Sequence, residues 1–169
     1  MNKSLIGKKA EELLARWLDN RQSEGYCFDR LKDQMSMYAN STNICDFTLF
    51  KSPYFYYIES KSTEHDRFDF SQIRGYPDES DTKSQYGGLL MKSKILCVRG
   101  IVVILFVNYQ RAFIIDIREI KRLTDSGKKS ININDIDSIK HYEIPIIQNN
   151  RKKYLRFDYV GDFKVYGDI

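Results

Sequence analysis

Cysteine, histidine and long apolar runs are scarce in this sequence, and each scarcity excludes a class of protein. The chain has only two histidines, which argues against a zinc site built on histidine. It has three cysteines, and no two of them form a Cys-x-x-Cys pair. Because Cys27, Cys45 and Cys97 each lie in an apolar run, we expect buried, reduced thiols in a cytoplasmic protein.

The longest apolar run, Ile101 to Val107, is far shorter than the roughly 20 residues that cross a membrane. The N-terminus leads directly into a charged amphipathic pattern, without the apolar core of a signal peptide. A chain of 169 residues with 42% hydrophobic content can form one domain with a real core. We therefore expect a single domain over 1–169 and no membrane partner. The net charge of +4 permits a polyanionic partner without requiring one.

The most informative stretch runs from Asn43 to Lys61 and is typical of a β-hairpin. Aromatic and β-branched residues fill two runs, and Lys51-Ser52-Pro53 breaks them. If the turn centres between Ser52 and Pro53, Asp46 and Glu59 lie directly opposite each other, with Cβ atoms about 4.5–5.5 Å apart. Lys61 follows Glu59 by two residues and so points to the same face of the sheet.

Two facing carboxylates repel each other, and a sheet does not normally keep such a pair without a reason. The residues around Asp46 and Glu59 are apolar, so both charges emerge from strands that are otherwise buried. Buried charges need partners or a metal, and a bound divalent cation would explain this pair. The alternative is an ordinary charged hairpin at a sheet edge, in which Lys61 pairs with Glu59 or Asp46.

Helical and extended patterns surround the hairpin. Their order predicts an α/β fold, a three-layer sandwich with a mixed central β-sheet flanked by helices. A long polar, turn-rich loop is expected over Ser62–Ser84, and such loops are usually functional or mobile. The elements that we expect are helices over Ser4–Asp19, Thr82–Lys94 and Arg118–Leu123, a short helix near Asp135, strands over Gly25–Leu31, Gly100–Val107 and Arg111–Ile117, and extended segments over Tyr142–Ile147 and Tyr154–Val160.

Other charged residues are less specific. Glu11 lies at the border of the apolar stripe of the first helix, where a solvated helix charge is the simple interpretation. Arg30 and Lys32 stand at the start of a polar loop that precedes the hairpin. They could contact phosphate, or they could be solvated surface cations.

Several short motifs occur together in one order, and this order is more specific than any of them. They are Gly7-x-x-x-Glu11-Glu12-x-Leu14, Asp46, Glu59-Ser60-Lys61, Phe68-Asp69-Phe70 followed by Gln85, Gly127-Lys128-Lys129-Ser130-Ile131, and Leu155-Arg156-Phe157-Asp158-Tyr159. In this order the chain resembles the PD-(D/E)XK nuclease superfamily and, within it, the RecU family of Holliday junction resolvases. The resemblance covers nearly the whole chain, from Gly7 to about Phe163.

The resemblance implies a restriction-endonuclease-like fold and a metal-dependent endodeoxyribonuclease that resolves four-way DNA junctions in recombination and repair. It also implies a homodimer, for which Ile101–Val107 or the C-terminal apolar segments could supply the interface. Asp46, Glu59 and the Ser60 carbonyl would hold Mg²⁺, for which Mn²⁺ can substitute. Lys61 would orient the attacking water, and Gln85 would position the water or the phosphate. Glu11 would act in the outer shell or bind a second metal.

DNA contacts are expected from four cations, namely Arg30, Lys32, Lys128 and Lys129. RecU proteins carry a long stalk before the catalytic aspartate, and 32–43 is too short for one, so junction specificity is the weakest implication. The loop at Ser62–Ser84 could take over part of that contact. Alternatives are a restriction-type or repair nuclease acting on linear or single-stranded DNA, a non-catalytic DNA-binding relative, and a structural or interaction protein.

Overall fold

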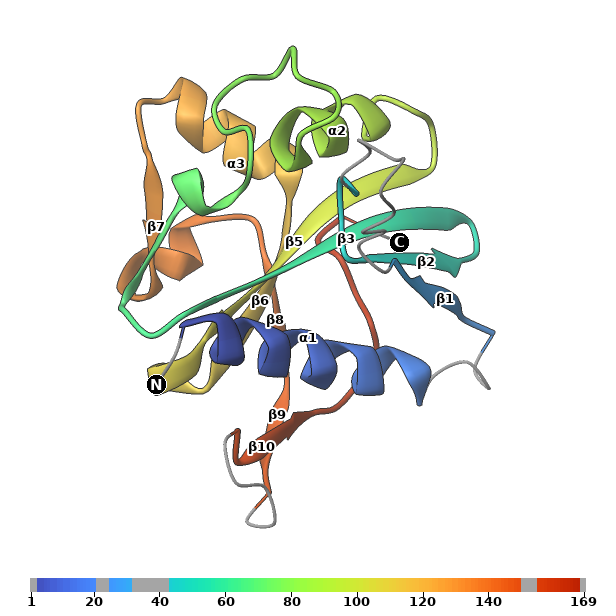
Figure 1. Ribbon diagram of the computed structural model, residues 1–169, viewed down its shortest axis with the longest axis vertical. Coiled ribbons are helices and arrows are strands. Elements are labelled where there is room, and N and C mark those ends of the chain that lie inside the picture. Colours follow the sequence, from blue (N-terminus) through green and yellow to red (C-terminus); the bar gives the residue numbers. More distant parts are fainter. Residues whose placement is uncertain (1–2, 21–24, 32–42, 150–154, 168–169) are drawn as a thin grey trace.

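The structure is a computed structural model that describes residues 3–20, 25–31, 43–149 and 155–167. A twisted six-stranded sheet crosses the molecule, with helices on both faces (Figure 1). The predicted α/β class, a mixed central sheet flanked by helices, is therefore confirmed. The strand order is β1 (Cys27–Arg30), β2 (Phe47–Lys51), β3 (Tyr54–Thr63), β5 (Val98–Phe106), β6 (Arg111–Asp116) and β8 (Tyr142–Ile144). Among the described strands of this sheet, β3 and β5 are the one pair that runs in parallel.

Each face of the sheet has its own hydrophobic core. On one face, α1 (Lys3–Asp19) packs its predicted apolar stripe against alternate residues of the strands, and this stripe is buried from Ala10 to Leu18. On the other face, α2 (Gln85–Lys92) and α3 (Ile117–Asp125) cover the remaining strand residues, whose side chains point away from α1. The two faces of β5 are both buried, as its continuous apolar run predicts.

This burial corrects one expectation about assembly. The strand expected at a dimer interface, β5, lies in the middle of the sheet, and its residues from Gly100 to Phe106 are all buried within the chain. Several C-terminal apolar residues, such as Phe157 and Phe163, also pack into the core beneath α1. Ile147 and Tyr166 are exposed, however, so an interface through the C-terminal apolar segments stays a prediction, whereas β5 is not available to a second copy.

The long loop predicted over Ser62–Ser84 is confirmed for 73–84, which consist of turns and bends, but its first part is regular structure. Strand β3 continues to Thr63, and the chain then forms β4 (Arg67–Asp69) and the 3-10 helix η2 (Phe70–Gln72). Phe68, Phe70 and Ile73 are completely buried. The prediction missed β4 and η2 because the polar residues between these three apolar side chains hide any helical or strand period. Two small sheets complete the fold. One pairs β4 with β7 (Ser130–Asn132), and the other pairs β9 (Ile146–Gln148) with β10 (Phe157–Tyr159). Two further 3-10 helices are η3 (Val107–Tyr109) and η4 (Ile133–Ser138), and η4 lies where a short helix was expected.

Helix α2 starts later than the sequence predicted, because Ser84 is its N-cap and accepts a hydrogen bond from the Gly87 backbone. The Gly87-Gly88 pair lies where α2 is closely packed. A Cβ atom at Gly87 would lie 2.4 Å from the Asp81 carbonyl oxygen, and one at Gly88 would lie 2.6 Å from the Ile44 Cγ2 atom. Both glycines therefore allow the backbone of α2 to approach its neighbours closely.

The three cysteines are free thiols, but only Cys45 is buried. Cys27 is exposed because β1 is an edge strand, and Cys97 is half-buried in the turn before β5. The expectation of burial was therefore wrong for Cys27 and Cys97. Among the described residues, no helix combines the length and the apolar character needed to cross a membrane.

Candidate active site

The predicted hairpin register is confirmed. Five pairs join β2 and β3, from Lys51 opposite Tyr54 to Phe47 opposite Ile58. The ladder ends there, one residue before Asp46 would face Glu59. The hairpin is also not at a sheet edge, because β3 lies between β2 and β5. The alternative of an ordinary charged hairpin at a sheet edge is therefore wrong about its location, although Lys61 does pair with Glu59 as that alternative expected.

Strand β3 continues for five residues beyond the last pair with β2, and Asp46 occupies the place next to it. The Asp46 backbone N–H donates to the Ile58 carbonyl at 3.0 Å, and its Oδ2 atom accepts the Ser60 backbone N–H at 2.8 Å. In a strand, the N–H and C=O of one residue point to the same side. The Ser60 carbonyl therefore also faces the side on which Asp46 lies.

Glu59 is the most deeply buried acid of this site, with only 2% of its surface exposed. Burial raises the pKa of Glu59 to about 8, the nearby Asp46 carboxylate adds to this, and the Lys61 ammonium opposes it. Its Oε2 atom is buried and has no hydrogen-bond partner among the described residues. An unpartnered buried oxygen of this kind is a candidate ligand atom.

Lys61 and Gln85 surround the other oxygen of Glu59. Lys61 Nζ lies 2.7 Å from Glu59 Oε1, and Gln85 Nε2 donates to the same oxygen at 2.6 Å. The Gln85 Oε1 atom accepts hydrogen bonds from Lys61 Nζ at 3.1 Å and from the Arg74 backbone N–H at 3.0 Å. The three side chains predicted for one site are thus in direct contact, although Gln85 comes from a different element.

Cys45 completes the buried part of the site. Burial raises the pKa of its thiol to about 12, and the Glu59 carboxylate contributes to this. The thiol therefore stays protonated at neutral pH and donates to the Phe47 carbonyl at 3.3 Å. A protonated thiol is a poor metal ligand, so Cys45 belongs to the apolar wall around Glu59.

An open cavity of about 620 Å³ adjoins the site, between the first turns of α1 and the end of β3. Glu11 lines this cavity together with Ser60 and Lys61, so α1 brings the predicted acid to the same place. Glu11 also accepts a hydrogen bond of 3.0 Å from the Arg30 guanidinium, which stacks near the Phe47 ring. Arg30 is therefore held at the site by an acid.

The other predicted DNA contacts are elsewhere. Lys32 lies outside the described residues. Lys128 and Lys129 are exposed in the turn between α3 and β7 and do not line the cavity.

Several residues at the cavity come from 62–84, where the sequence predicts only a loop. His65, Asp69 and Gln72 line the cavity from the turn after β3 and from β4 and η2. Arg74, from the same segment, was not predicted either, and it contacts Gln85. Asp69 belongs to the Phe68-Asp69-Phe70 motif, which was the only sequence signal for this segment.

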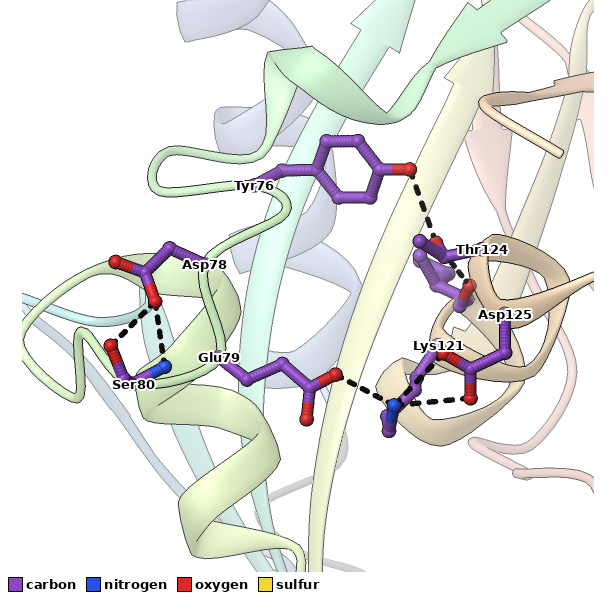
Figure 2. A network of polar contacts seen from close by, with 8 residues as sticks. Tyr76, Asp78, Glu79, Ser80, Lys121, Thr124 and Asp125 are labelled. Carbon is purple, nitrogen blue, oxygen red and sulfur yellow. Dashed lines mark hydrogen bonds and ion pairs between the residues drawn. The ribbon is translucent and has the colours of Figure 1, made fainter. Parts of the chain in front are cut away.

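Residues 73–84, which we call the strap, lead from η2 to the N-terminus of α2 and are fastened to α3 (Figure 2). Lys121 Nζ bonds to Glu79 at 2.6 Å and to both carboxylate oxygens of Asp125 at 2.9 and 3.0 Å. Thr124 donates to the Tyr76 hydroxyl at 3.2 Å. Because Gln85 directly follows the strap, these contacts with α3 help to fix Gln85 over Glu59.

The residues at the site fit a hard divalent cation. Within the described residues, no group of three or more His, Cys, Asp or Glu side chains could hold a metal together. Two carboxylates do lie close, since Asp46 acts on the pKa of Glu59, and the unpartnered Glu59 Oε2 is an oxygen ligand. Mg²⁺ commonly uses one or two carboxylates and takes water for the rest, so this small donor set suits it.

Comparisons with known proteins give a limited answer. No family model matches the chain, and no curated protein matches it. Among solved structures, the chain is similar to the Holliday junction resolvase Hjc from the archaeal hyperthermophile Archaeoglobus fulgidus, with 13% sequence identity and a TM-score of 0.49. The match covers 79% of this chain and 93% of that chain. A likeness of this extent assigns no activity, and the resemblance to RecU proteins stays a prediction.

Proposed function

We propose that this protein is a Mg²⁺-dependent endonuclease that hydrolyses phosphodiester bonds in DNA, with its active site at Asp46, Glu59 and Lys61. The observation that carries the proposal is the burial of Glu59 beside a second carboxylate, with one oxygen unpartnered. A buried acid with a strongly perturbed pKa is a feature of catalytic sites, and Lys61, which contacts Glu59, lines the adjoining cavity. For folding alone such an arrangement is a cost.

Asp46, Glu59 and the Ser60 carbonyl would hold the metal ion. When bound, Mg²⁺ polarises the scissile phosphate and lowers the pKa of an attacking water. The two carboxylates come from different segments, so the site forms only when the segment before β2 is in place. Mn²⁺ has the same preference for oxygen ligands and should substitute.

Lys61 would orient the attacking water and offset the negative charge that develops on the phosphate. Its ammonium group has three donors, and contacts to Glu59 and Gln85 account for two of them. The third can therefore reach water or phosphate in the cavity. Gln85 would keep the side chains of Lys61 and Glu59 in their relative positions. Glu11, which lines the cavity, would act in the outer shell of the metal or bind a second metal.

We further propose that the substrate is branched DNA, a four-way junction in the first instance, and that the protein acts in the cytoplasm as a homodimer of single nuclease domains over 1–169. A pair of related active sites is the natural arrangement for cutting two strands symmetrically. The residues that would contact phosphates are Arg30, which bonds to Glu11 of the cavity lining, and Lys32, Lys128 and Lys129. A nuclease for linear DNA would use the same catalytic residues, so only the substrate preference separates the two.

The test is cleavage of a labelled four-way junction and of a linear duplex of the same sequence, with Mg²⁺ or with EDTA. Asp46→Ala and Glu59→Ala should abolish Mg²⁺-dependent cleavage while DNA affinity stays within a few-fold, because affinity comes mainly from phosphate contacts by Lys and Arg. Glu12→Ala is the matched control, since Glu12 is an acid of α1 that is paired with Lys9 and not at the site. Wild-type turnover in either active-site variant would remove the assignment.

A further inference from the structure

The segment that carries Asp46 lies beyond the ladder of β2 and β3 and needs other support. Residues 43–46 are held in part by the backbone bond from Asp46 to Ile58, and Leu31 donates to the Asp46 carbonyl at 2.8 Å. Ile44 packs against Gly88 of α2. The start of the segment, Asn43, is held by a side chain from elsewhere in the fold.

That side chain belongs to Arg74, in the strap. Its Nη2 atom donates to the Asn43 carbonyl at 2.7 Å. The backbone of the same residue bonds to the start of α2, because its N–H donates to Gln85 Oε1 and its carbonyl accepts the Tyr86 N–H, both at 3.0 Å. One residue thus joins the segment of Asp46 to the helix of Gln85.

The position of Arg74 is itself well determined. The next residue, Gly75, has a φ of +87°, and a Cβ atom there would lie 2.2 Å from the Ser84 side chain. The two ends of the strap are therefore packed together, and the contacts from Lys121 and Thr124 fasten its middle to α3 (Figure 2). Because the backbone of Arg74 is fixed in this way, its guanidinium group can fix the position of Asn43, three residues before Asp46.

We propose that Arg74 is a positioning residue that sets Asp46 against Glu59, and that it thereby determines the affinity of the site for a divalent cation. This inference rests on the proposed function, since it concerns the same metal. The donor of this hydrogen bond is a charged guanidinium group, and such bonds are stronger than those between two neutral groups. Groups that support metal ligands from outside typically change metal affinity by 10–100-fold when they are removed.

The test is direct Mn²⁺ binding to the DNA-free protein, measured by electron paramagnetic resonance or calorimetry. Arg74→Met keeps the length of the side chain and removes every donor, and we expect Mn²⁺ binding to weaken by about 10-fold or more. Arg74→Lys restores a donor and should recover most of the affinity. Arg118→Met is the matched control, because Arg118 is an exposed arginine of α3 that pairs with Asp116, the N-cap of that helix. The Mn²⁺ affinity of this variant should equal that of the wild type.

The outcomes separate the inference from the proposed function. If wild type, Asp46→Ala and Glu59→Ala all bind Mn²⁺ equally weakly, the proposed function fails. If the two carboxylate variants lose Mn²⁺ but Arg74→Met keeps wild-type affinity, the positioning role is wrong. A loss of DNA affinity and of salt dependence in Arg74→Met, with Mn²⁺ binding unchanged, would instead make Arg74 a phosphate contact. Should Arg74→Met fail to fold, Arg74→Leu, which also lacks a donor, takes its place, and unchanged Mn²⁺ affinity in that variant overturns the inference.

Discussion

Gln85 donates a hydrogen bond of 2.6 Å to Glu59 and accepts one from Lys61, so the side chain that begins α2 holds together two residues of β3. Gln85 lies 24 residues after Lys61 in the chain, in a helix and not in the sheet. The relationship depends on the strap, which delivers Gln85 to this face of the sheet. It also means that the site can be disturbed without touching an acid or a cation.

Replacing Gln85 tests this arrangement. Gln85→Met keeps the volume of the side chain but removes the donor to Glu59 and the acceptor for Lys61. We expect a loss of about 1–3 kcal/mol in the free energy of unfolding, because a buried carboxyl group loses a partner, together with a fall in the cleavage rate. Urea denaturation and single-turnover cleavage measure the two effects. Gln148→Met, at an exposed position of β9, should change neither, and full activity in Gln85→Met would show that Gln85 has no role in the reaction.

The raised pKa of Glu59 predicts how stability depends on pH. The folded-state pKa of about 8 exceeds the ordinary value of 4.5, so folding favours the protonated form. This contribution is fully present below about pH 4.5 and is lost as the pH rises through 8. In EDTA the melting temperature of the wild type should therefore fall between pH 6 and 9 more steeply than that of Glu59→Gln, which cannot ionise. Parallel curves for the two proteins would contradict the raised pKa.

Saturating Mg²⁺ should reduce that pH dependence in the wild type. The metal needs the ionised carboxylate, so its binding releases a proton below pH 8 and strengthens as the pH rises. The stabilisation by Mg²⁺ should thus be larger at pH 8.5 than at pH 6.5 and absent in Glu59→Gln. Melting curves with Mg²⁺ and with EDTA at both pH values measure this difference, and an equal shift at both values would argue against Glu59 as a ligand.

Preference for branched DNA is tested with the Asp46→Asn protein, which should bind without cutting. Phosphate contacts alone bind any duplex and weaken steeply with salt, whereas contacts that depend on the shape of a junction survive moderate salt better. We expect a four-way junction to out-compete linear duplex at two salt concentrations, by a margin smaller than a full stalk would give. If linear duplex competes equally at both, the junction proposal fails and a general nuclease takes its place.

The oligomeric state is a separate prediction. We expect a homodimer in light scattering at micromolar concentration, with or without DNA. Since β5, Phe157 and Phe163 are buried in the chain, substitutions there would test folding and not assembly. A stable monomer under both conditions would count heavily against symmetric cutting by paired sites.

Local rules were enough to predict the hairpin and the stripe on α1. The break at Lys51–Pro53 and the alternation on either side set the register that pairs Phe47 with Ile58. The same rules could not show that the ladder stops at Phe47, because that depends on where Arg74 and α2 hold the preceding segment. Gln85 was found only through the order of motifs, since no periodicity marks a contact between distant elements.

The errors have one physical cause. Phe68, Phe70 and Ile73 fill the core at irregular spacing, and Gly87-Gly88 permits a close approach that only the packed structure reveals. Both depend on tertiary neighbours, which local propensity does not describe. The exposed position of Cys27 likewise follows from the place of β1 at the edge of the sheet.

The parallel pairing of β3 with β5 has a consequence for how such a site can arise. An antiparallel partner could follow β3 after a tight turn, whereas a parallel partner requires the chain to travel back along the sheet before it pairs. Here the return path contains η2, the strap and α2, and it crosses the face on which Glu59 lies. Because β5 runs parallel to β3, the connecting segment has to pass back over the sheet, and in this chain it places α2 next to Glu59. Substitutions in this connecting segment can therefore change the properties of Glu59 and Lys61 while the hairpin itself stays unchanged.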